Sequence, residues 1–213
     1  MKVSIIGTGS IGGTVAKKLV KAGYKVSIAN SRGKSAVEKF AGEIGAEPRD
    51  LESISKNAEI LIISIPFGAI PKLPKDIFLK LPKSSIVIDT SNYYSEVRKE
   101  EFDESKPESV WVSEQIGRKV IKTFNNMLAY SLENLGKDKN EKNRLCIQIA
   151  GDDEEQKKIV KKLINDCGFD PYDNGNLENS RSQQPNSAGY CCDYTCEELK
   201  EVKKKIETDT WKC

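Results

Sequence analysis

The sequence predicts an α/β fold in which helices cover both faces of a doubly wound parallel sheet. Three observations point to this fold. A glycine-rich turn stands between the first predicted strand and the first predicted helix, at residues 7–13. Short apolar segments then alternate with amphipathic segments of helical period, as they do in α/β folds. Residues 59–65 are almost continuously apolar, a pattern typical of a parallel strand that is buried on both faces.

The glycine turn lies inside a strand, turn, helix and strand arrangement. Residues 2–6 form a short apolar strand that leads into the run Gly7-Thr8-Gly9-Ser10-Ile11-Gly12. Apolar residues then recur at helical spacing, Gly23 ends this helix, and residues 25–29 form a second strand. This order is the fingerprint of a Rossmann-type dinucleotide-binding fold. The alternative is a glycine-rich turn in an α/β domain that binds no ligand.

Each glycine of the turn has an expected role. Gly7 allows the chain to turn tightly off the strand, and Gly12 allows the helix to pack closely on it. Gly9 removes the side chain that would keep a pyrophosphate away from the backbone. The free N–H groups and the positive end of the helix dipole then face the phosphates.

The end of the second strand indicates which dinucleotide is bound. NAD-specific sites usually place an acidic residue there, which accepts a hydrogen bond from the ribose 2′-hydroxyl. This chain has Asn30, Ser31 and Arg32, then Lys34, and its next acid in sequence is Glu38. A guanidinium and an ammonium suit a 2′-phosphate, so the sequence predicts NADP(H) rather than NAD(H). The alternative is that the two cations only begin a solvated helix.

The next predicted elements continue the alternation. Apolar residues on one face predict a helix over residues 35–44 that ends at Gly45. Residues 46–48 suggest a short third strand, and Asp50 a cap for a short helix before residue 57. Strands follow at residues 59–65 and 86–89, and the proline-rich residues 66–83 between them predict an irregular crossover.

Strand ends of an open parallel sheet meet at one edge, where the ligand binds. Ser64, Ile65 and Pro66 follow one buried strand, and Asn92 follows the next. We expect these residues to face the cofactor, with Pro66 and Phe67 as a wall and Asn92 as an amide for hydrogen bonding. An ordinary rigid turn and a locally satisfied asparagine are the alternatives.

The remaining chain completes the sheet and adds a tail. Helices are expected over residues 108–115, from Asn126 to Leu135 and before Gly168, and strands over residues 120–124, 145–150 and 169–172. Seven or eight strands result. We therefore expect a nucleotide-binding domain over residues 1–173 and a C-terminal cap over residues 174–213. In the cap, Thr195 and Glu198 predict a capping box for a last helix with an apolar stripe.

Composition excludes several classes of function. The 213 residues carry 34 basic and 32 acidic side chains, for a net charge of +2, so neither nucleic acid nor membrane is an expected partner. Met1 leads almost directly into the first strand, and no apolar stretch is as long as a membrane span. A cytoplasmic protein with reduced cysteines is expected. The chain has no histidine, which excludes His-based triads and zinc sites, and no metal site or catalytic side chain is predicted.

Beyond the first turn, further motifs occur in a characteristic order. They are Ala29-Asn30-Ser31-Arg32-Gly33, the run from Ile116 to Asn125, and Ala150-Gly151-Asp152-Asp153. With the glycine turn, they resemble the NADPH-dependent F-420 reductase family over about residues 1–190. The resemblance implies hydride transfer between NADP(H) and the deazaflavin coenzyme F-420, in a cleft between the sheet and the C-terminal part. It also implies that residues 7–12 hold the pyrophosphate and that Ser31 and Arg32 hold the 2′-phosphate.

The predicted function is therefore that of an NADP(H)-dependent oxidoreductase with a small-molecule hydride acceptor, either F-420 or a flavin. Reduction of an imine or a carbonyl is an alternative, and it needs a Tyr or Lys as proton donor because histidine is absent. A non-catalytic NADP(H) sensor is another. We expect a homodimer, in which the last helix docks on the body or on the second subunit. Cys191, Cys192 and Cys196 fit neither a zinc nor a thioredoxin spacing.

Overall fold

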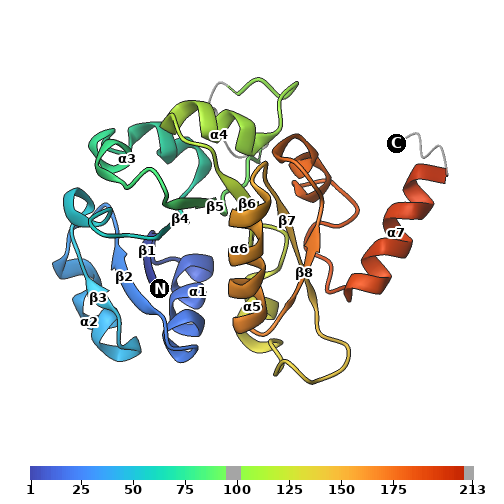
Figure 1. Ribbon diagram of the computed structural model, residues 1–213, viewed down its shortest axis with the longest axis horizontal. Coiled ribbons are helices and arrows are strands. Elements are labelled where there is room, and N and C mark those ends of the chain that lie inside the picture. The colour runs from blue at the N-terminus through green and yellow to red at the C-terminus, as the bar shows by residue number, and fades with distance from the viewer. Residues whose placement is uncertain (95–101, 209–213) are drawn as a thin grey trace.

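Eight strands form one sheet in the part of the chain that the computed structural model describes, residues 1–94 and 102–208. Their order is β3-β2-β1-β4-β5-β6-β7-β8. The strands are β1 (Lys2–Ile6), β2 (Lys25–Ala29), β3 (Glu47–Pro48), β4 (Ile60–Ile63), β5 (Ile86–Asp89), β6 (Ile121–Thr123), β7 (Cys146–Ala150) and β8 (Asp170–Asp173). The predicted α/β fold with a doubly wound sheet is confirmed (Figure 1).

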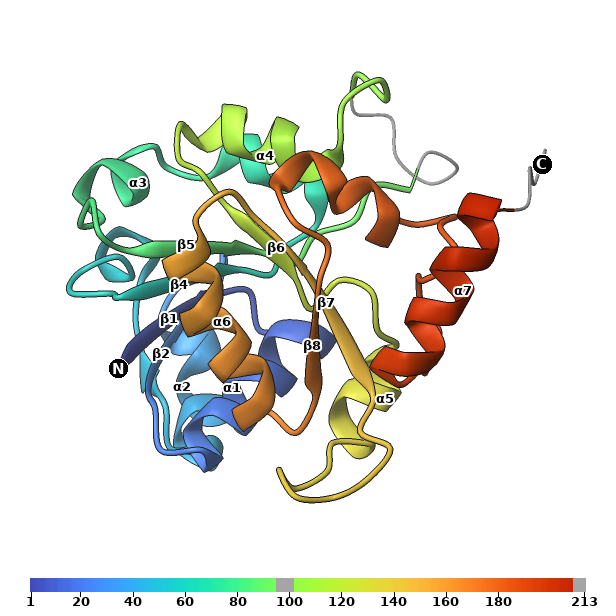
Figure 2. The ribbon, with the colours of Figure 1, turned by 45° about the vertical axis from the view of Figure 1, so that its right-hand side comes forward.

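Helices lie on both faces of this sheet (Figures 1 and 2). The α-helices are α1 (Ser10–Lys21), α2 (Ser35–Ile44), α3 (Asp76–Lys80), α4 (Glu108–Ile116), α5 (Ala129–Asn134), α6 (Glu154–Asp166) and α7 (Cys196–Thr208). Three 3-10 helices are η1 (Leu51–Ser53), η2 (Phe67–Lys72) and η3 (Leu177–Gln183). Residues 66–83, predicted to be irregular, thus contain η2 and α3, and η3 lies in the predicted C-terminal cap.

The apolar side chains form one core on each face. In β4, Ile60 and Ile62 pack with α1, α2, α5 and α6, whereas Leu61 and Ile63 pack with η2, α3 and α4. Successive side chains of a strand point to opposite faces, so a strand covered on both sides needs a continuous apolar run. This explains why residues 59–65 carry almost no polar side chain.

One strand pair differs from the predicted parallel sheet. β6 and β7 are antiparallel, with Lys122 opposite Ala150, whereas each other neighbouring pair in the described sheet is parallel. β7 therefore begins at the same edge of the sheet at which β6 ends, and the chain between them does not cross back to the opposite edge. An apolar strand reads the same in either direction, so its residues carry no information about this reversal.

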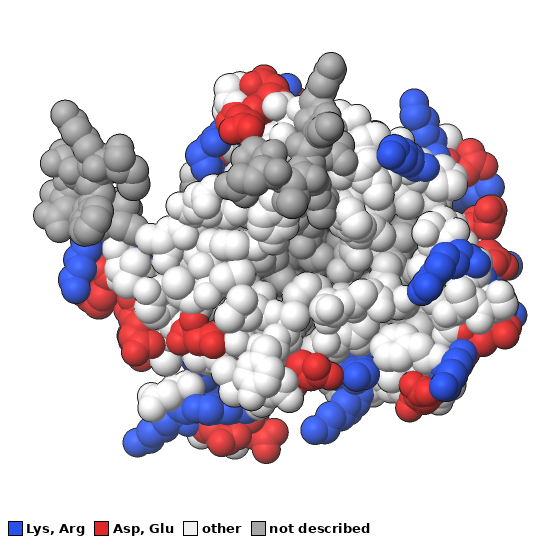
Figure 3. Space-filling view, turned by 180° about the vertical axis from the view of Figure 1, so that it is seen from behind, with Lys and Arg blue, Asp and Glu red and all other residues white. Residues whose placement is uncertain are grey.

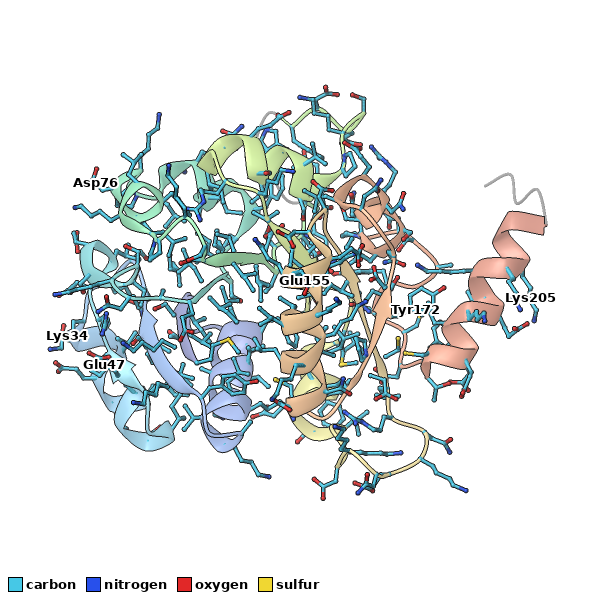
Figure 4. The ribbon with its side chains drawn as sticks, viewed as in Figure 1. Lys34, Glu47, Asp76, Glu155, Tyr172 and Lys205 are labelled. Atoms are coloured by element: carbon cyan, nitrogen blue, oxygen red, sulfur yellow. The ribbon has the colours of Figure 1, made fainter. Side chains whose placement is uncertain are left out.

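The C-terminal segment is attached to the far edge of the sheet. The predicted capping box of α7 is present, because Thr195 N–H donates to Glu198 Oε2 at 2.8 Å and Glu198 N–H donates to Thr195 Oγ1 at 3.3 Å. Leu199 is buried, and the Lys203 ammonium lies 4.9 Å from the centre of the Tyr172 ring on β8. Figure 4 shows Tyr172 on β8 and Lys205 on the neighbouring α7.

Charges of both signs are spread over the surface. On the face shown in Figure 3, the described Lys, Arg, Asp and Glu side chains lie mainly around the rim, and the middle is uncharged. In the described residues, no helix combines the length and apolar character that crossing a bilayer requires.

Candidate nucleotide and acceptor site

The glycine turn connects β1 to α1. Gly7 has a φ of +102°, and a Cβ built there would lie 2.0 Å from the carbonyl oxygen of Ser64. A Cβ at Gly12 would lie 2.2 Å from the carbonyl oxygen of Gly7. Both positions therefore exclude any side chain, because real Cβ atoms do not approach so closely. The expected tight turn and close packing of helix on strand are observed.

Gly9 lies in a different environment. No described atom lies within 4 Å of a Cβ built at Gly9, which is the N-cap of α1. The first turn of α1 contains no acidic residue, so its N–H groups and the positive end of its dipole face open space. Thr8, Ser10 and Ile11 complete the turn, and the Ile11 side chain packs on the core. This arrangement fits a pyrophosphate held by backbone N–H groups.

Asn30 shapes the loop that follows β2. Its buried Oδ1 accepts from the N–H of Arg32 at 2.9 Å, and its Nδ2 lies 3.5 Å from Thr8 Oγ1. The amide thus links the two loops at the carboxyl ends of β1 and β2. The Ser31 and Arg32 side chains are exposed, and within the described residues the guanidinium of Arg32 makes no ion pair. This guanidinium is therefore able to donate hydrogen bonds to a phosphate.

Two acids that the strand-end prediction did not include lie at the same corner. The Lys34 N–H donates to Asp50 Oδ1 at 2.9 Å. Contrary to the prediction, the Asp50 side chain makes no capping hydrogen bond to η1. Glu47 accepts from Arg49 at 2.9 Å, and chiefly this hydrogen bond lowers the pKa of Glu47. Figure 4 shows Lys34 and Glu47 at this corner. β3 pairs with β2 in parallel, so the two strands end at the same corner of the sheet. The predicted third strand could therefore have indicated that acids near its end lie beside the end of β2.

The end of β4 supports the glycine turn. Ser64 N–H donates to the Ile6 carbonyl at 2.8 Å, and the Ser64 and Ile65 atoms lie directly against the Cβ positions of Gly7 and Gly12. Pro66 is exposed at the start of η2. Phe67 is fully buried and stacks on Trp111 with ring centres 4.4 Å apart. The expectation that Phe67 forms a wall of the cofactor site is therefore wrong, because its ring belongs to the core.

Asn92, after β5, joins an amide network. Its Nδ2 donates to the Asn125 carbonyl at 3.0 Å and to the Tyr190 hydroxyl at 3.2 Å, and Asn125 Nδ2 donates to Asn92 Oδ1 at 2.9 Å. Phe124, which precedes Asn125, has a φ of 59°. This conformation is strained for a bulky residue, and it falls where β6 ends beside the site. The sequence gives no indication of it.

A cavity of about 450 Å³ opens beside this network. Its lining residues are Tyr93, Tyr94, Phe102, Glu104, Glu108, Arg181, Gln184, Pro185, Asn186, Ser187 and Tyr190. The hydroxyls of Tyr94 and Tyr190 are hydrogen-bonded to each other. Burial, with the hydrogen bond between Tyr190 and Tyr94, raises the pKa of Tyr190, so this phenol stays protonated at neutral pH. Tyr190 could not be predicted as a site residue, because Tyr190 and Asn92 lie 98 residues apart along the chain.

A buried group of charges lies under the cavity. The ammonium of Lys122 lies 3.2 Å from Asp89 Oδ2 and 3.4 Å from Glu108 Oε2, and the three side chains are almost completely buried. Asp89 also accepts from the Ser109 hydroxyl at 2.6 Å. Burial raises the pKa of Glu108, against the opposing effect of Lys122. These contacts connect β5, β6 and α4. In the sequence, Lys122 inside a mostly apolar strand could have indicated this buried cluster.

Comparison with known proteins agrees with this geometry. Residues 2–93 match the family model described as NADP oxidoreductase, coenzyme F420-dependent. The fold resembles that of hypothetical protein SMa0349 from Sinorhizobium meliloti, with a TM-score of 0.75 and 25% identity over 92% of this chain and 95% of that one. A protein from Arthrobacter sp. fb24, described as a candidate F420-dependent NADP reductase, has a TM-score of 0.71 and 20% identity over 85% of this chain and 88% of that one.

A shorter relative is protein YjhV of Escherichia coli strain K12. It is 41% identical over 51 residues, which are 24% of this chain and 37% of that protein. The match thus spans little more than a third of that relative. Fold and glycine turn together show a Rossmann-type dinucleotide-binding fold, and the family match of residues 2–93 is to NADP oxidoreductases. Residues 2–93 are thus similar to the F420-dependent NADP oxidoreductase family, the family that the sequence motifs resemble.

Proposed function

We propose that this protein transfers a hydride between NADPH and the deazaflavin coenzyme F-420 or a similar flavin-like acceptor. The observation that carries the proposal is the position of the cavity. Asn92, at the end of β5, hydrogen-bonds to Tyr190 in the cavity wall. The cavity therefore adjoins the sheet edge at which the glycine turn opens.

Named residues account for the binding of NADP(H) in this proposal. The N–H groups of Gly9, Ser10 and Ile11 would hold the pyrophosphate, and Ser31 and Arg32 would hold the 2′-phosphate. Lys34 would add a point charge. Ser64, Ile65 and Pro66 would support the glycine turn and the start of η2, and Asn92 would orient the nicotinamide end. When bound, NADPH supplies the hydride, and the protein supplies alignment.

The cavity suits a flat acceptor. Tyr93 and Phe102 provide aromatic walls, with ring centres 5.0 Å apart. Gln184 and Asn186 add amide groups for the polar edge of a ring. Such a cavity beside the predicted nicotinamide position favours an enzyme over a non-catalytic NADP(H) sensor.

The pair of tyrosine hydroxyls supports a second candidate, the reduction of an imine or a carbonyl. Such a substrate needs a proton as well as a hydride. Tyr190, kept protonated by burial and linked to Tyr94, could donate that proton inside the cavity. Transfer to a deazaflavin or flavin makes no comparable demand on one side chain.

The test is a measurement of NADPH consumption with four parallel reactions: F-420, a riboflavin-type flavin, a cyclic imine and no acceptor. Turnover with F-420 or the flavin is expected, and Tyr190→Phe should retain most of it. Turnover with the imine alone, abolished in Tyr190→Phe, would transfer the assignment to the second candidate. NADPH binding without turnover of any acceptor would contradict both and favour the sensor.

A further inference from the structure

Two cysteines far apart in the sequence meet at the start of α7. Cys146 is the first residue of β7 and is buried, whereas Cys196 is the first residue of α7 and is partly exposed. Their Sγ atoms lie 2.7 Å apart. That distance is within 1 Å of the roughly 2.05 Å length of an S–S bond, so little movement separates the two thiols from a covalent link.

The backbone, and not only the side chains, brings the two cysteines together. Leu145 and Thr195 form an antiparallel bridge, and the Cys146 N–H donates to the Tyr194 carbonyl at 2.7 Å. Residues on one face of such a pair lie close, directly opposite or diagonally. The Thr195–Glu198 capping box then fixes where α7 begins. The close approach is therefore built into two separate backbone features.

We propose that Cys146 and Cys196 are a redox-sensitive dithiol, which closes to an intramolecular disulfide in the presence of a disulfide oxidant such as oxidised glutathione. Partly exposed Cys196 reacts first, and its thiolate attacks the disulfide of the oxidant. Its sulfur bonds to one sulfur of the oxidant, and the first glutathione leaves with the Cys196 proton. The Cys146 sulfur then displaces the second glutathione, which takes the Cys146 proton. Two thiols lose two electrons in total, and one glutathione disulfide becomes two glutathiones.

The other thiols are poorer candidates. Cys167 is buried, and burial raises its pKa to about 12. Cys146 is also buried, and chiefly its hydrogen bond with Cys196 raises its pKa, but it reacts second and lies beside the partly exposed Cys196. Cys192 has its Sγ 3.4 Å from the Tyr190 carbonyl. In residues 1–94 and 102–208, no group of three or more His, Cys, Asp or Glu side chains could hold a metal ion.

The bond would have a consequence for the cavity. It would close a loop between Cys146 and Cys196, which contains η3 and the residues from Gln184 to Tyr190 that form one cavity wall. Oxidation would therefore fasten this wall and the start of α7 to the sheet. A cross-link of this kind stabilises the fold mainly by restricting the unfolded chain.

The experiment treats the full-length protein with oxidised glutathione, blocks free thiols by alkylation and analyses the digested peptides by mass spectrometry. A peptide pair joined through Cys146 and Cys196, lighter by two hydrogen atoms than the two thiols, is expected. The melting temperature should rise by about 5–10 °C, and dithiothreitol should reverse the rise.

Two variants distinguish this pair from other thiols. Cys192→Ser should keep the joined peptide and the rise in melting temperature, whereas Cys196→Ser should lose both. Complete alkylation of Cys146 and Cys196 in the treated protein would overturn the proposal. A rise in melting temperature that persists in Cys196→Ser would also overturn it, because another disulfide would then be responsible.

Discussion

Gly7, Gly9 and Gly12 differ in what a side chain at each position would meet. At Gly7 and Gly12 an added Cβ would collide with backbone oxygens, whereas at Gly9 it would project into open space. The first two glycines are therefore needed for the fold, and Gly9 is needed only by a ligand. All three positions are glycine, so residue type alone does not distinguish their roles. Only their spacing within the fingerprint predicts which glycine serves the fold and which serves the ligand.

Gly9→Val should abolish binding of both NADPH and NADH while the protein stays folded, because the new side chain fills the space proposed for the pyrophosphate. Isothermal titration calorimetry measures the loss, and circular dichroism checks the fold. Gly42→Val is the matched control, since no described atom lies within 4 Å of a Cβ at Gly42 either. Unchanged affinity in Gly9→Val would contradict the proposed site.

Arg32→Ala should weaken NADPH binding about 10- to 100-fold and leave NADH binding nearly unchanged, because a hydrogen bond to a charged group contributes roughly 1.5–3 kcal/mol. Dissociation constants for both cofactors measure the effect. Lys39→Ala, which removes an exposed cation within α2, is the control and should change neither. Equal losses for NADPH and NADH would show that Arg32 does not contact the 2′-phosphate.

Helices and strands could be predicted where the hydrophobic period and the glycine stops agree. α2 ends at Gly45, in the left-handed conformation, as the pattern indicated, and β5 has its predicted bounds. The reversal between β6 and β7 could not be predicted, because pairing direction depends on the path of the connecting chain. The cavity could not be predicted either, because residues near 94, 108 and 190 meet only after folding.

The junction between α6 and β8 makes stability depend on pH. Burial opposes ionisation of Asp173, but hydrogen bonds from Lys161, Gly175 N–H and Lys157 outweigh it and hold its pKa below the ordinary 3.8. A carboxyl with a lowered folded-state pKa stabilises the fold above its unfolded-state pKa, and this contribution is lost as pH falls through the folded-state value.

Asp173→Asn should therefore lower the free energy of unfolding by about 1 kcal/mol at pH 7. The difference from wild type should shrink as pH falls below about 4. Urea unfolding at pH 7 and at pH 3 measures both values. Asp138→Asn, in an exposed loop, is the matched control and should show little difference at pH 7. A constant difference between the two pH values would contradict the role given to this carboxylate.

The assembly of the protein depends on what covers α7. Leu199 is buried against the same chain, and Val202 is half-buried, so the first part of the helix docks on its own body. We propose that the half-buried Val202 contacts a second copy and that the protein is a homodimer. Figures 1 and 2 show α7 at the margin of the molecule, where a second copy could reach it.

Removal of residues 195–213 should convert the dimer to a monomer, and Val202→Asp should weaken the dimer while Leu199 keeps α7 docked. Sedimentation velocity at several protein concentrations measures both effects. Glu201→Lys, on an exposed part of the same helix, is the control for charge. A folded truncated protein with the wild-type assembly, or a monomeric wild type, would exclude this role of α7.

The reaction proposed for this protein is direct hydride transfer from bound NADPH to an acceptor in the cavity. The most direct measurement uses NADPH that carries deuterium at the transferable position of nicotinamide C4, with F-420 and a flavin as acceptors and mass spectrometry of the products. With F-420, we expect one deuterium bound to carbon in the reduced deazaflavin, and a lower rate than with unlabelled NADPH where transfer limits turnover. Reduced F-420 without deuterium from either C4 position would contradict direct transfer.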